Sequence, residues 1–151
     1  MQRVSQDTCG EDGVAGAPVD LVKRFTRTPM ETSFPLFRTR VHLSTNSPAL
    51  QKRFSFAVAP CQQQAEFHCK IVVEPVEDED LARGCPTVSR IHANGLSLIS
   101  IGQKSFLALD AVNRRAVSFV SELLILDEAL FRGYFLPALT LLLQCSSEIT
   151  P

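Results

Sequence analysis

Residues 88–101 have the sequence VSRIHANGLSLISI, and this stretch decides the fold. Two runs with strand-like alternation, 88–93 and 96–101, flank the dipeptide Asn94-Gly95. Asparagine and glycine adopt the positive φ angles that both central residues of a two-residue type I′ turn require. The stretch therefore predicts a β-hairpin.

The segments on either side extend this hairpin into an antiparallel meander. Downstream, Gly102-Gln103 separates the hairpin from an apolar run at 104–109, and the turn Asn113-Arg114-Arg115 precedes another at 116–120. Upstream, period-two alternation is found, with decreasing regularity, at 54–58, 66–73 and 38–43. Alternation of this kind is typical of half-buried strands. We expect a mainly antiparallel sheet in which three or four adjacent strands are joined by short turns.

The end of the chain predicts a helix. Asp127 is a candidate N-cap, and Glu128 and Arg132 have the spacing of an ion pair one helical turn apart. Residues 133–143 carry no charge. Pro137 lies inside this run, where its ring would press on the carbonyl of Gly133, so a kinked continuous helix and two short helices are both compatible with the sequence.

This apolar helix is too short to span a bilayer, which needs roughly 20 apolar residues. A helix that is apolar all round must be covered on several sides, and the chain ends soon after Leu143. We therefore expect the cover to come from outside the chain, through a protein partner or self-association. The expected interaction surface consists of the helix residues Phe131, Tyr134, Phe135, Leu139 and Leu142.

Composition places the chain among folded proteins. The 151 residues (16.7 kDa) are 45% hydrophobic and 21% charged, values that exclude bulk disorder. Residues 1–35 are rich in glycine and proline and predict an irregular lead-in, so that residues 36–151 form a single α+β domain with the C-terminal apolar helix laid across the sheet. The net charge of −1 excludes a globally basic nucleic-acid binder.

The five cysteines form no compact pairing pattern, and Met1 to Asp20 contain no apolar run of a secretory signal. These features predict a reducing, cytoplasmic setting. Six residues separate Cys61 from His68 and also Cys85 from His92, but structural zinc sites draw their ligands from shorter spacings, so no metal site is expected.

No enzymatic motif is found. The segment Gly102-Gln103-Lys104-Ser105 departs from a phosphate-binding loop because Gln103 separates the glycine from the lysine, and the preceding residues alternate as a strand does. The acidic run 77–80 lacks the spacing of a calcium loop and predicts a solvated loop. We expect no catalytic residue, no cofactor and no enzymatic activity.

One basic segment offers an alternative function. Between residues 21 and 53 seven cationic residues stand against Glu31 alone, so the local charge is 7 − 1 = +6. Phenylalanines interleave with these cations, and on a sheet such a segment, 21–56, could bind single-stranded nucleic acid by stacking bases on the rings. The competing interpretation is that the rings face the core and the cations face water. The cations are Lys23, Arg24, Arg27, Arg38, Arg40, Lys52 and Arg53, and the rings are Phe25, Phe34, Phe37, Phe54 and Phe56.

From Leu96 onward the order of elements resembles the N-terminal portion of HPr serine kinase-like proteins, which are bacterial relatives of HPr kinase/phosphorylase. The resemblance is carried by Asn94-Gly95-Leu96, by 106–110 with 114–117, and by the helix 131–144. Pro137 stands where these proteins usually have glycine, and Cys145-Ser146-Ser147 replaces a basic-glycine pair. The phosphate-binding loop that follows in that family is absent before Pro151. The resemblance implies a non-catalytic accessory domain, truncated before the kinase module, whose helix packs on a partner.

Overall fold

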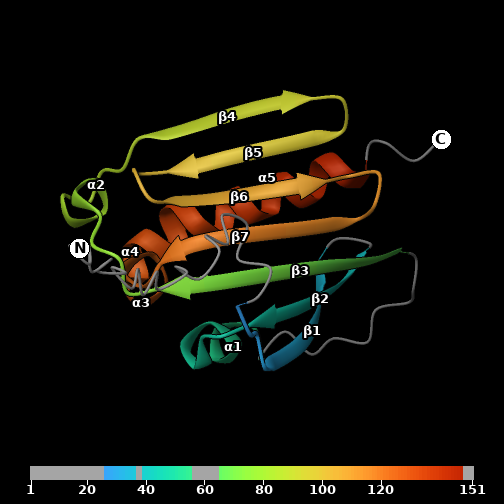
Figure 1. Cartoon of the computed structure of the whole chain (residues 1–151), viewed down its shortest axis with the longest axis horizontal. Coiled ribbons are helices and arrows are strands. Elements are labelled where there is room, and N and C mark those ends of the chain that lie inside the picture. The colour runs from blue at the N-terminus through green and yellow to red at the C-terminus, as the bar shows by residue number, and fades with distance from the viewer. Residues whose placement is uncertain (1–25, 37–38, 56–64, 148–151) are drawn as a thin grey trace, which may run out of the picture.

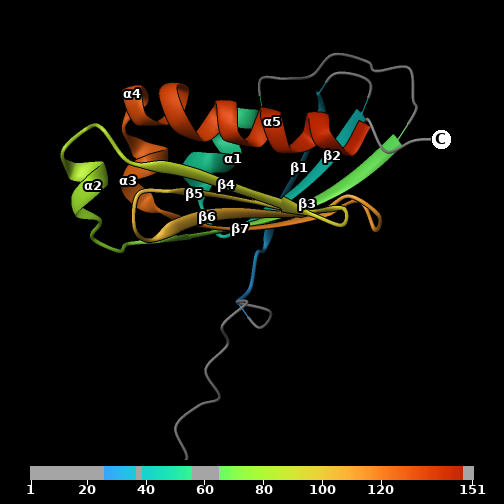
Figure 2. The same cartoon turned by 90° about the horizontal axis from the view of Figure 1, so that it is seen from above.

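The computed structural model describes residues 26–36, 39–55 and 65–147. They form one seven-stranded sheet with the strand order β1-β2-β3-β7-β6-β5-β4 and a layer of helices on one face (Figures 1 and 2). The fold is therefore α+β, as the sequence predicts. In chain order the elements are β1 Met30–Leu36, β2 Thr39–Thr45, α1 Pro48–Phe54, β3 Ala65–Glu74, α2 Glu79–Ala82, β4 Val88–Ala93, β5 Leu96–Ile101, β6 Ser105–Asp110, β7 Arg115–Ser121, α3 Glu122–Leu126, α4 Glu128–Leu130, the π-helical turn η1 Phe131–Phe135, and α5 Leu136–Ser147.

The predicted meander is confirmed. Strands β4 to β7 pair in sequence order, each antiparallel to the next. Asn94 and Gly95 have φ angles of 51° and 79°, as the type I′ turn requires, and the next turn has a positive φ at Gly102. Local turn chemistry thus builds half of the sheet.

The other half depends on pairings that the sequence did not predict. Strand β3 runs parallel to both of its neighbours, β2 and β7, and β1 pairs antiparallel with β2. Since β1 begins at Met30, the sheet starts before the boundary expected at residue 36. Pro35 in this strand obscures its pattern, because proline is usually confined to strand edges.

The helical segment at the end of the chain is continuous through Pro137. The N–H of Leu136 donates to the carbonyl of Phe131, five residues earlier, which gives the π-helical turn η1 immediately before Pro137. A wider turn at this point fits the proline ring that a regular helix would press against Gly133. Asp127 caps the N-terminus of α4 by accepting from Leu130 N at 2.9 Å, and Glu128 pairs with Arg132, as predicted.

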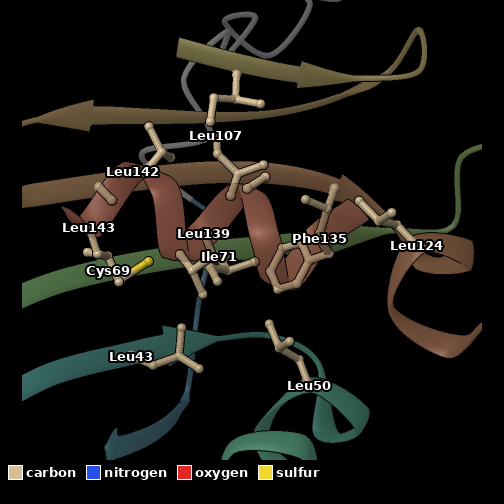
Figure 3. Close-up of a cluster of buried hydrophobic side chains, with 14 of the residues drawn as sticks. Leu43, Leu50, Cys69, Ile71, Leu107, Leu124, Phe135, Leu139, Leu142 and Leu143 are labelled. Atoms are coloured by element: carbon tan, nitrogen blue, oxygen red, sulfur yellow. The ribbon is translucent and has the colours of Figure 1, made fainter. Parts of the chain in front are cut away.

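The core lies between the sheet and α5 (Figure 3). Helix side chains such as Leu139 and Leu142 meet Leu43, Ile71 and Leu107 from the strands. The sheet of the same chain therefore covers the apolar helix. In the part of the chain that the structure describes, no helix is long and apolar enough to cross a membrane.

Candidate functional site

The residues expected to form an interaction surface lie in the core instead. Phe131, Phe135, Leu139 and Leu142 are all buried, with Leu139 only 1% exposed, and Tyr134 is partly buried against the same cluster. The expectation of an uncovered helix is wrong for these four residues. It failed because the pairing of β3 with β7 makes the sheet wide enough to cover the helix.

The described members of the basic, phenylalanine-containing segment are also engaged in packing. The rings of Phe34 and Phe54 are buried and stack on each other with centroids 4.5 Å apart. Arg53 donates to the carbonyl of Ile125 and to Glu128 while its guanidinium lies over the ring of Phe131. These rings cannot stack on bases in this fold. Phe25, Phe37 and Phe56 lie outside the described residues.

The turn at Gly102-Gln103-Lys104 already holds an anion from its own chain. Asp78 is buried, and its Oδ2 accepts the backbone N–H groups of Gln103 and Lys104, each at 2.9 Å. Its Oδ1 accepts from Asp80 N and Leu81 N and so caps α2. The expectation of a solvated loop over 77–80 is therefore wrong for Asp78, which is buried. The amides that could otherwise meet a phosphate bind a carboxylate.

The described residues contain no group of three or more histidine, cysteine or acidic side chains that could hold a metal ion. His68 and His92 lie on strands separated by β7, β6 and β5. Cys69 is buried and Cys85 is exposed. Cys61 lies outside the described residues.

The two faces of the sheet differ sharply in their side chains. Residues that pair across neighbouring strands lie on the same face. One face, which α5 covers, contains buried side chains such as Leu43, Cys69 and Leu109. Among the described residues no helix covers the other face, which we call the open face (Figure 2). Two rows of residues follow one another across it in the order β1 to β4: Ser33, His42, His68, Arg115, Asp110, Leu96 and Ala93, and then Glu31, Ser44, Lys70, Val117, Ala108, Leu98 and Ile91.

The half of the open face over β1, β2 and β3 is polar. A hollow of about 540 Å³ is lined there by side chains that include Ser33, His42, His68, Lys70 and Arg115. Ser33 Oγ and His42 Nδ1 share a hydrogen bond of 2.9 Å. The two imidazole rings stack with centroids 5.1 Å apart.

In this polar half His42 connects a hydroxyl to a carboxylate, because its Nδ1 bonds to Ser33 and its Nε2 lies 3.6 Å from Glu66 Oε1. A serine that contacts a histidine, which in turn contacts a carboxylate, is the arrangement of a catalytic triad. Such a triad also needs N–H donors aimed at the developing oxyanion. The backbone N–H groups around Ser33 and His42 lie in the plane of the sheet, between paired strands. The arrangement therefore fits binding better than acyl transfer.

Over β4, β5 and β6 the open face has an apolar area, beside the polar residues Ser89, Ser100 and Asp110. A second hollow, of about 590 Å³, is lined there mainly by aliphatic side chains, and Arg115 and Val117 line both hollows. Ile91 is 64% exposed, Leu96 is 59% exposed and Leu98 is also exposed. We call Ile91, Leu96, Leu98 and Ala108 the apolar patch. Large side chains exposed together in this way are typical of interaction surfaces.

The apolar patch adjoins an edge of the sheet. Strand β4 is the last strand in the order, and all six of its residues are exposed. Among the described residues no strand pairs with its outer side. The patch and the edge together offer a partner both apolar contacts and backbone hydrogen bonds. The sequence contains the signal for the patch, in the alternation of 88–101, but not the face on which it lies.

The chain matches no family model, no curated protein and no solved structure in the comparisons made with known proteins.

Proposed function

We propose that this chain is a non-catalytic interaction domain that docks on a protein partner through the apolar patch and the outer edge of β4. The observation that carries the proposal is the exposure of Ile91 and Leu96 beside the outer edge of β4, which pairs with no strand among the described residues. A partner that adds a strand at such an edge gains main-chain hydrogen bonds, while side-chain contacts on one face give specificity.

Two features of the described residues support this surface over the others. The apolar face of α5 is already used in the core, so the helix offers few large side chains to a partner. The polar hollow at His42 and His68 borders the patch through Arg115 and Val117, and it supplies polar groups at one side of the docking surface. A surface with an apolar centre and a polar margin is the usual anatomy of a protein interface.

The resemblance to the N-terminal portion of HPr serine kinase-like proteins stays a prediction, together with the bacterial origin and cytoplasmic location that go with it. If it holds, the domain packs against a nucleotide-binding module. Nucleic-acid binding by residues 21–56 also stays a prediction, and the packing of Phe34 against Phe54 does not favour it. A titration with single-stranded DNA at low salt tests it directly.

The experiment for the proposed function is site-specific photo-cross-linking in cells that express the full chain. A photoreactive phenylalanine analogue is placed at Ile91 or Leu96 in the patch, and at the exposed Arg132 on the helical layer as the control. We expect discrete protein adducts at Ile91 and Leu96, and none at Arg132. Equal labelling at all three positions, or no adduct at any of them, contradicts the proposal.

A further inference from the structure

The hydrogen-bonding pattern of the hairpin determines which residues of β4 present their backbone to a partner. Val88 is opposite Ile101, and the next pair outward forms a hydrogen bond from Gly102 N to the carbonyl of Thr87 at 2.8 Å. In an antiparallel pair the hydrogen-bonded positions alternate, so residues 89, 91 and 93 direct their backbone groups to β5. The N–H and C=O groups of Val88, Arg90 and His92 therefore face outward.

The opposite edge of the sheet is less able to pair. Pro35 in β1 has no N–H, and Gln51 Nε2 donates to the carbonyl of Glu31. Pairing of β4 with β1 of another copy would be head-to-tail and would give a larger ring or an open filament, whereas pairing of β4 with β4 closes a twofold dimer. The difference between the two edges favours the closed arrangement.

Two registers of β4 against β4 overlap most of the strand and set outward-facing groups opposite outward-facing groups. In the first, Ile91 lies on the twofold axis opposite its own copy, and Arg90 pairs with His92 of the other copy. In the second, Arg90 lies opposite its own copy. Since β4 contains no carboxylate, the second register leaves two guanidinium groups side by side without a counter-charge from the strand.

The first register also continues the apolar patch. Ile91 is opposite Leu98 within one copy, and Leu98 is opposite Ala108. Placing Ile91 against Ile91 joins the two patches into one apolar band that crosses the dimer axis. We propose that the partner of this surface is a second copy of the chain, paired antiparallel through β4 with Ile91 on the twofold axis. This inference rests on the proposed interaction function.

The first experiment measures mass by light scattering over a concentration series of the full chain. We expect a reversible dimer for the wild type. Ile91→Lys places two ammonium groups opposite each other and is expected to weaken dimerisation about tenfold or more. The control is Val112→Lys, because Val112 is 71% exposed and lies in the turn between β6 and β7 rather than in β4, and it keeps the dimer. Thermal melts that match the wild type show that both variants fold.

The second experiment tests the register in a variant whose Cys9, Cys61, Cys85 and Cys145 are replaced by serine. Ile91→Cys is expected to form an intermolecular disulfide with itself, because opposed non-hydrogen-bonded residues bring their Cα atoms to about 4.5 Å. Arg90→Cys alone is expected to remain reduced. Cross-linking through Arg90→Cys in place of Ile91→Cys overturns the proposed pairing.

The outcomes separate this inference from the function on which it rests. A chain that stays monomeric at all concentrations, with photo-adducts at Ile91 that contain other proteins, overturns self-pairing and leaves the interaction function standing. A monomer without any adduct at the patch overturns both. Adducts of twice the chain mass at Ile91, absent at Arg132, support both.

Discussion

Replacing Asp78 tests whether a single buried carboxylate joins the meander to α2. Asp78 is 4% exposed and accepts four backbone N–H groups, two from the start of α2 and two from the turn between β5 and β6. In Asp78→Ala, loss of the helix cap costs about 1 kcal/mol. The N–H groups of Gln103 and Lys104 lose their acceptor at about 1 kcal/mol each, the low end of the range, because their exposed turn admits water.

The total is about 3 kcal/mol, which corresponds to a fall in Tm of about 6–12 °C for a chain of this length. Asp78→Asn is a sharper variant, because either orientation of the amide turns an NH2 group toward two N–H donors. We expect it to cost about 2 kcal/mol or more. The measurement is urea unfolding followed by circular dichroism. The control is Glu77→Gln, an exposed neighbour with the same change of charge, for which a change within about 0.5 kcal/mol is expected. If Asp78→Asn is as stable as Glu77→Gln, the Asp78 carboxylate does not join α2 to the turn between β5 and β6.

Three further predictions concern the turns and the core. Gly102→Ala places a Cβ 2.7 Å from Asp78 Oδ2 at a φ of +68°, whereas the Cβ of Gly84→Ala meets open space at a φ of +78°. We therefore expect urea unfolding to show a loss of unfolding free energy about 1–2 kcal/mol larger for Gly102→Ala than for Gly84→Ala. Equal losses for the two variants would contradict this. Burial raises the pKa of the Cys69 thiol to about 12, so iodoacetamide should label the exposed Cys85 in the native chain and Cys69 only after unfolding; rapid native labelling of Cys69 would refute it. The Asn113 side-chain and backbone hydrogen bonds lower the pKa of Asp110 in the folded chain below its ordinary value of 3.8. The ionised Asp110 carboxylate therefore stabilises the fold above pH 3.8, and this stabilisation is lost as the pH falls through the pKa of Asp110 in the folded chain. Asn113→Ala should therefore lose less stability than the wild type between about pH 5 and about pH 2, and parallel curves would show that the hydrogen bond is not responsible.

The sequence predicts those features that depend on neighbouring residues. The turn at Asn94-Gly95, the cap at Asp127 and the Glu128–Arg132 pair each depend on a few consecutive residues, so turn and helix preferences are sufficient. Asp78 is different, because its partners Gln103 and Lys104 lie some 25 residues away and no local pattern relates them. The parallel pairing of β3 with β7 is equally non-local, since it brings His68 opposite Arg115.

The error about the C-terminal helix has the same origin. The apolar run does need cover, but the amount of cover depends on how many strands join one sheet. Once β3 pairs with β7, Ile71 and Leu43 are added to the strands of the meander beneath Leu139. The exposed apolar surface therefore lies on the open face of the sheet, at Ile91, Leu96 and Leu98, and not at the four helix residues that are buried in the core.

The position of that surface argues for a specific interface rather than a general tendency to aggregate. Ser89 and Ser100 hydrogen-bond to each other on the row of the open face beside Ile91 and Leu98, and Asp110 and Arg115 oppose each other beside Leu96. Polar groups thus lie beside the apolar patch on β4 and β5. On β6 and β7 the apolar surface continues to Phe106 and Val117, and at β4 it reaches the outer edge of the sheet. A partner that covers the patch and also pairs with this edge is held in register by the outward backbone groups of β4. The outer edge of β4 therefore gives the interaction its direction.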